Sequence, residues 1–142
     1  MQRIFRAVLL CLVSGICVAA ESPAQAPAQM AEAFLTQLGR NEPDAAIDAL
    51  FAGSGMPELK PQAITAMKSQ VKVTLGMYGK MTGFEKISET EFSPSLKRMT
   101  YLQKFEQYPV IWEMYFYRIK DRWVVNQVYF NDQPATVLTA RP

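Results

Sequence analysis

Between residues 30 and 78, apolar side chains recur at steps of three and four, which is the spacing of one face of an α-helix. The first run ends at Gly39, and the second opens at Pro43, whose fixed φ suits the first position of a helix. Residues 52–61, with two Gly and two Pro, break the pattern before the longest run, 62–78. The spacing therefore predicts three helices.

After Gly83 the helical spacing gives way to alternation of apolar and polar residues, which is typical of strands. The expected strands cover residues 84–92, 97–107, 110–119 and 123–130. Their connections are too short for a crossover, so neighbouring strands should be antiparallel. We expect an α+β fold, with three N-terminal helices packed on one face of a four-stranded antiparallel sheet.

The first 20 residues have the features of a signal peptide. Arg3 and Arg6 precede an apolar run over residues 7–18, which is too short to span a membrane, and small residues lead up to a cleavage site expected after Ala20. We expect a periplasmic or secreted protein with no stable membrane anchor after cleavage. A disordered Pro- and Ala-rich spacer (21–29) would precede a domain at 30–131 and a C-terminal tail at 132–142.

Composition removes several function classes. Without Arg3 and Arg6, the 15 basic residues become 13 and equal the 13 acidic ones, a balance that argues against nucleic-acid binding. The chain has no histidine, and Cys11 and Cys17 both lie in the leader. The mature chain therefore has no disulfide, thiol nucleophile or imidazole base, and we expect neither a metal site nor a cofactor.

Alternation sorts the side chains of the sheet into two faces. A two-residue hairpin around Asp121 and Arg122 would pair even positions of the third strand with odd positions of the fourth. The face expected to meet the helices then carries Tyr101, Gln103, Trp112, Met114, Gln127 and Tyr129. The opposite face carries Ile111, Tyr115, Tyr117, Val124, Val128 and Phe130.

The order of elements and the closing pattern EMYFYRIKDRWVVNQVYFND resemble the nuclear transport factor 2-like superfamily, also called cystatin-like or SnoaL-like. The resemblance covers about residues 30–131 and implies a sheet curved into a cone around the long helix, with an apolar inner cavity, and often a dimer formed through the sheet. Members usually carry Gly where Arg122 stands, which suggests a longer loop here. Enzymes of this superfamily use Asp, His and Tyr in the cavity. Without histidine, their catalytic positions do not carry over, and we assign no catalytic residue.

The six residues on the helix-facing side, Tyr101, Gln103, Trp112, Met114, Gln127 and Tyr129, are the candidates for lining such a cavity. Their polar groups could orient a small apolar ligand. The alternative is that they are core residues whose polar groups satisfy one another or the backbone.

Carboxylates are the remaining source of acid/base chemistry. Asp44 and Asp48 lie four residues apart on the second helix, and Glu85, Glu89 and Glu91 share one face of the first expected strand. Both sets are typical of solvated surface, although the second offers oxygen ligands for a divalent cation. Glu113 is surrounded by aromatic residues and is expected to pair with Arg98 or Lys104, or to be buried in a dimer.

Our first hypothesis is an exported, non-catalytic domain that binds a small apolar ligand or a protein partner in a cone-shaped cavity. An alternative is an isomerase- or dehydratase-like enzyme that uses Tyr101 or Tyr129 with a helix-borne Asp. A carboxylate within hydrogen-bonding reach of a cavity tyrosine would favour it. A third hypothesis is a structural homodimer without a ligand.

The apolar outer face predicts a homodimer. Its interface candidates are Ile111, Tyr115, Tyr117, Val124, Val128 and Phe130, which would together expose a large apolar patch. In the competing account, the tail at residues 133–142 folds back over the patch within one chain.

Overall fold

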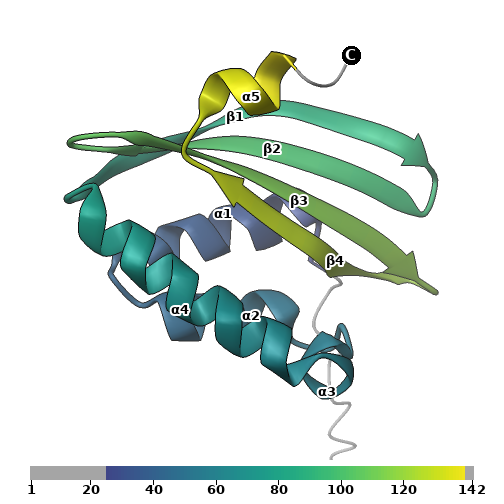
Figure 1. Cartoon of the computed structure of the whole chain (residues 1–142). Coiled ribbons are helices and arrows are strands. Elements are labelled where there is room, and N and C mark those ends of the chain that lie inside the picture. The colour runs from purple at the N-terminus through teal and green to yellow at the C-terminus, as the bar shows by residue number, and fades with distance from the viewer. Residues whose placement is uncertain (1–24, 140–142) are drawn as a thin grey trace, which may run out of the picture.

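A computed structural model of the chain describes residues 25–139. Helices α1, α2, α3 and α4 precede a sheet of four strands, and helix α5 follows it (Figure 1). The bounds are α1 Pro27–Gly39, α2 Pro43–Phe51, α3 Met56–Leu59, α4 Pro61–Met77, β1 Met81–Ser93, β2 Leu96–Phe105, β3 Pro109–Ile119, β4 Arg122–Asn131 and α5 Pro134–Thr139. The expected signal peptide and cleavage site, residues 1–20, lie outside the described residues.

Proline opens each of the three longer helices. Pro27, Pro43 and Pro61 each occupy a first-turn position, where the missing N–H costs no hydrogen bond. Helix α1 thus begins three residues before the predicted start, and Pro27, expected in a disordered spacer, is buried. The Pro- and Gly-rich break contains the one-turn helix α3, preceded by Gly55 with a φ of 73°.

The sheet is the predicted antiparallel meander in the order β1-β2-β3-β4. The last hairpin has two residues in its loop, as predicted, but they are Lys120 and Asp121, because Arg122 pairs with Ile119 in the ladder. Lys120 takes the positive φ of 54° that such a tight turn requires. The longer loop suggested by the missing Gly does not form.

Helices α1, α2 and α4 lie on one face of the sheet, whereas α5 lies on the other (Figure 1). The core between sheet and helices is built from buried apolar residues of α1, α2, α4, β2, β3 and β4. At its centre the rings of Phe34 on α1 and Trp112 on β3 meet edge to face, with centroids 5.0 Å apart.

A β-bulge in β4 changes which side chains face the helices. Phe116 pairs with Val125, but Tyr115 pairs with Gln127, so Asn126 is an extra residue in β4. Because side chains alternate, one inserted residue moves every later position to the opposite face. The predicted faces are therefore correct up to Val125 and wrong after the bulge.

Four of the predicted site residues lie after the bulge, so the face predicted for each of them is wrong. Gln127 and Tyr129, expected inside, lie on the outer face opposite Tyr115 and Glu113. Val128 and Phe130, expected outside, lie on the helix-facing side opposite Met114 and Trp112.

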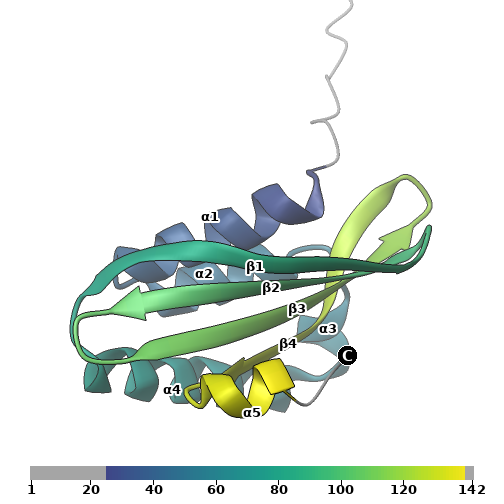
Figure 2. The same cartoon turned by 90° about the horizontal axis from the view of Figure 1, so that it is seen from above.

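The outer face is less open than the sequence suggested. Ile111 and Val124, two interface candidates, are only 1% and 4% exposed within the single chain. Helix α5 contacts β3 and lies at the β4 side of this face, away from β1 (Figure 2). Helix α5, the described part of the tail, thus lies over part of the sheet, as in the competing account, and leaves aromatic residues such as Tyr117 exposed.

Candidate functional site

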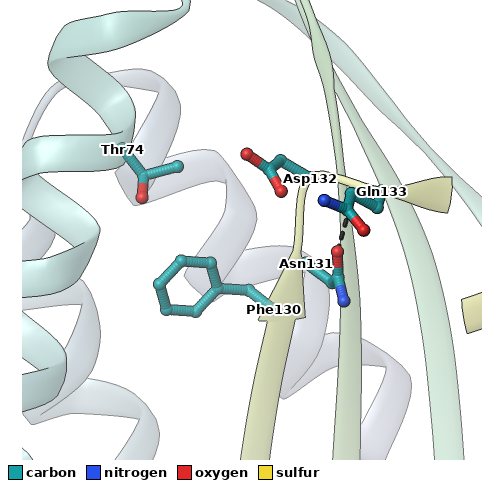
Figure 3. Close-up of a pocket in the computed structure, with 5 residues that line it drawn as sticks. All are labelled: Thr74, Phe130, Asn131, Asp132 and Gln133. Atoms are coloured by element: carbon teal, nitrogen blue, oxygen red, sulfur yellow. Dashed lines mark hydrogen bonds between the residues drawn. The ribbon is translucent and has the colours of Figure 1, made fainter. Parts of the chain in front are cut away.

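A groove runs between helix α4 and strand β4. Two adjoining pockets, of about 360 and 520 Å³, share Thr74 on α4 and Phe130 on β4 and together form this α4–β4 groove. Its remaining lining residues are Ser69, Gln70 and Val73 from α4, and Asn131, Asp132 and Gln133 from the end of β4 and the residues that follow. Figure 3 shows Phe130 and Asp132 pointing toward α4, from which Thr74 points back.

The groove exists because α4 packs mainly against α2 rather than against β4. Only Ile64 and Val71 of α4 are buried, whereas Val73 is 64% exposed. Two ion pairs, Lys72–Asp44 and Lys68–Asp48, each with an N···O distance of 2.6 Å, join α4 to α2. Space is therefore left beside β4, and an exposed apolar side chain of α4 borders it.

The polar end of the groove is organised by two hydrogen bonds. The hydroxyl of Tyr78, just after α4, donates to Oδ2 of Asp132, just after β4. The backbone N–H of Gln133 donates to Oδ1 of Asn131 at 2.6 Å (Figure 3). The bond to Asp132, together with partial burial, raises the pKa of Tyr78, so the phenol remains the proton donor and the carboxylate the acceptor.

No family model and no curated protein sequence matches this chain. Its fold is similar to the crystal structure of a proposed NTF2-like transpeptidase from Campylobacter jejuni, with a TM-score of 0.57 and 12% sequence identity. The match covers 71% of this chain and 97% of that one. The chain has an NTF2-like fold. At this identity the likeness concerns the fold alone.

Within this NTF2-like fold, four of the predicted pocket residues are part of the core. Tyr101, Gln103, Trp112 and Met114 are fully buried, and none of them lines the α4–β4 groove. The indole N–H of Trp112 donates to Oε1 of Gln103 at 2.7 Å, and Gln103 Nε2 donates to the sulfur of Met81 at 3.2 Å. These contacts favour the alternative in which the polar groups satisfy one another.

Tyr101 has a carboxylate partner on a helix, but outside the groove. Its hydroxyl donates to Oε1 of Glu32 on α1 at 3.4 Å. Burial, reinforced by the charge of Glu32, raises the pKa of Tyr101 to about 12. The remaining pocket candidates, Gln127 and Tyr129, are exposed on the outer face, where the bulge places them.

The acidic residues singled out in the sequence form ion pairs. Asp44 and Asp48 bind lysines of α4, as described above, and Lys97 lies 2.9 Å from Glu91, a contact that raises the pKa of this lysine. On the outer face Glu113 pairs with Arg98 at 3.7 Å, one of the two partners expected from the sequence. Within residues 25–139 no group of three or more acidic, Cys or His side chains is arranged to hold a metal ion, and no helix is long and apolar enough to cross a membrane.

The sequence did not point to the residues that line the groove. Phe130 was assigned to the outer face because the bulge at Asn126 carries no Gly or Pro signal. Tyr78 and Asp132 are 54 residues apart, and no spacing rule links the end of a helix to the end of a distant strand. The local signal of the site in the sequence is the polar run Asn131-Asp132-Gln133, which begins at the end of the last strand.

Proposed function

We propose that this protein is a non-catalytic binding domain that takes a small, largely apolar ligand in the α4–β4 groove. The observation that carries the proposal is the groove itself, which has a volume of several hundred Å³ and places the Phe130 ring and Val73 between polar side chains of α4 and the polar residues at the end of β4. Small-molecule sites are concave and mostly apolar, with a small number of polar groups that fix orientation. In this proposal the groove is the opening of a cone-shaped space between the helices and the sheet.

A tyrosine and a carboxylate, Tyr78 and Asp132, do lie within hydrogen-bonding reach at the polar end, as the enzyme alternative requires, but the state of the tyrosine favours binding. The hydrogen bond to Asp132 raises the pKa of Tyr78, so this phenol is a weaker acid than an ordinary tyrosine and is poorly suited to give up its proton near neutral pH. The predicted enzyme would use Tyr101 or Tyr129 with a helix-borne Asp. Tyr101 is buried and bonded to the exposed Glu32, away from the groove, and Tyr129 lies on the outer face, so neither forms that arrangement in the groove.

The activity named for the Campylobacter jejuni protein does not enter the proposal. Residues 25–139 contain neither a thiol nor an imidazole, and the two chains share only 12% identity. We further propose that the domain acts in the periplasm or outside the cell, on the basis of the leader sequence and the expected cleavage after Ala20.

The proposal is tested by NMR titration of the protein with octanamide, a neutral amphipathic probe. We expect amide shifts to change at groove residues such as Thr74 and Asn131. Replacing Thr74 with Trp should fill the groove and abolish the changes.

The matched control is Thr65→Trp, because Thr65 is exposed and lies nine residues earlier on α4, which places it on the opposite face of the helix. This variant should bind as the wild type does. Equal binding by wild type and Thr74→Trp would contradict the groove as the site.

A further inference from the structure

Asp132, at the end of the groove, has no basic partner among residues 25–139, and neither have Glu32, Glu42, Glu58, Glu106 and Asp121, none of which lines the groove. Asp44, Asp48, Glu85, Glu89, Glu91 and Glu113 each pair with a lysine or arginine. Between residues 25 and 139, no Lys or Arg nitrogen lies within 4.0 Å of the Asp132 carboxylate. Its partner in this part of the chain is the neutral hydroxyl of Tyr78, so the negative charge at the end of the groove is not compensated there.

The Tyr78 hydroxyl fixes the position of this charge. It donates to Oδ2 of Asp132, and its ring is stacked on Tyr108 with centroids 5.4 Å apart and an interplanar angle of 28°. The carboxylate is therefore held in place by a side chain that is itself packed. A preoriented charge loses less freedom on binding, which strengthens the interaction with an incoming group.

An apolar surface begins next to the charge. The Phe130 ring lies two residues before Asp132 and points into the same space, with Thr74 on the facing side of α4 (Figure 3). Val73 lines the adjoining part of the groove together with Phe130. A bare metal ion would use only the single carboxylate and would leave this surface unfilled. An organic molecule with a cationic end and an apolar body matches both parts.

We propose that the α4–β4 groove selects amphipathic organic cations, whose ammonium group pairs with Asp132 while the hydrocarbon part lies on Phe130 and Val73. This inference rests on the proposed function, because it names the class of ligand that the groove takes. The charged end of the ligand supplies the counter-charge that the described part of the chain does not provide. The carboxylate repels anionic amphiphiles of the same length.

Three probes with the same carbon chain length separate charge from size: octylammonium, octanamide and octanoate, titrated into the protein by calorimetry at pH 7 and low salt. A hydrogen bond to a charged group strengthens binding by about ten- to a hundred-fold. We expect octylammonium to bind at least about ten-fold more tightly than octanamide, and octanoate to bind most weakly. Added salt should reduce the preference, because the charge lies in an open groove.

Asp132→Asn removes the charge but retains the size of the side chain and an acceptor for Tyr78. This variant should bind octylammonium and octanamide about equally. The control Asp48→Asn removes an acid on α2 that pairs with Lys68, and it should retain the wild-type preference.

Two results would overturn the ligand class. One is octylammonium binding no tighter than octanamide in the wild type, and the other is a preference that survives in Asp132→Asn. If octanamide still binds and Thr74→Trp blocks it, the proposed function stands and only the cation preference fails. If none of the three probes binds, the proposed function itself fails.

Discussion

Replacing Gln103 with Leu tests whether this residue belongs to the core rather than to a ligand site. Gln103 is fully buried, and its Oε1 accepts the indole N–H of Trp112 at 2.7 Å. Leucine has a similar size but no acceptor, so the indole N–H would be left unpaired in the core. Burying an unpaired donor costs about 1–3 kcal/mol.

We therefore expect Gln103→Leu to lower the free energy of unfolding by about 2 kcal/mol, the middle of that range. For a domain of about 100–150 residues, 1 kcal/mol corresponds to roughly 4 °C in Tm, so the variant should melt about 8 °C earlier. Binding of octanamide in the α4–β4 groove should not change, because Gln103 does not line it.

The assay is urea unfolding followed by circular dichroism, with Gln127→Leu as the matched control. Gln127 is also a strand residue, but it is exposed, and its replacement should change stability by less than about 0.5 kcal/mol. Adding Trp112→Phe to Gln103→Leu removes the unpaired donor, so the double variant should lose less than the sum of the two single losses. A stable Gln103→Leu variant beside a destabilised Gln127→Leu variant would refute the assignment of faces.

Three further predictions concern pH, assembly and export. Because the pKa of Tyr101 is raised to about 12 in the fold, its contribution to stability is complete below pH 10 and is lost as the pH rises toward 12. Between pH 7 and pH 11 the free energy of unfolding, measured in urea, should fall by about 1.4 kcal/mol more for the wild type than for Tyr101→Phe. Equal losses in the two proteins would contradict the raised pKa of Tyr101. We propose a homodimer through the outer face. The wild type should therefore sediment as a dimer at micromolar concentration, and Tyr117→Glu as a monomer. A monomeric wild type would mean that α5 suffices to cover the face. The intact mass of the protein recovered after export should equal that of a chain beginning at Glu21, whereas a full-length species retained in the membrane would contradict cleavage.

The sequence predicted the strands well because alternation and short connections leave few choices. The observed β3, Pro109–Ile119, differs from the expected strand by one residue, and the meander follows from loops as short as Lys120-Asp121. Helix starts were harder to predict. Pro27 opens α1 within a stretch whose composition resembles a linker, and only its packing against the core shows that it is ordered.

The site could not be predicted because it depends on one irregularity and one distant contact. The extra residue Asn126 reverses the faces of the last part of β4 and brings Phe130 into the groove. The pairing of Tyr78 with Asp132 requires the end of α4 to lie beside the end of β4, which tertiary packing decides and local pattern does not. Gln103 shows the opposite case. The sequence already allowed the alternative that the polar groups of the inner face hydrogen-bond to one another, and Gln103 does accept a hydrogen bond from Trp112.

A crystal structure of the protein with octanamide tests the central claim most directly. The account predicts the hydrocarbon chain in the α4–β4 groove, on the Phe130 ring and beside Val73, with the amide next to Asp132. Two results would contradict it: octanamide bound against Tyr101 and Trp112 inside the core, or α4 packed onto β4 so that Val73 is buried and no groove remains.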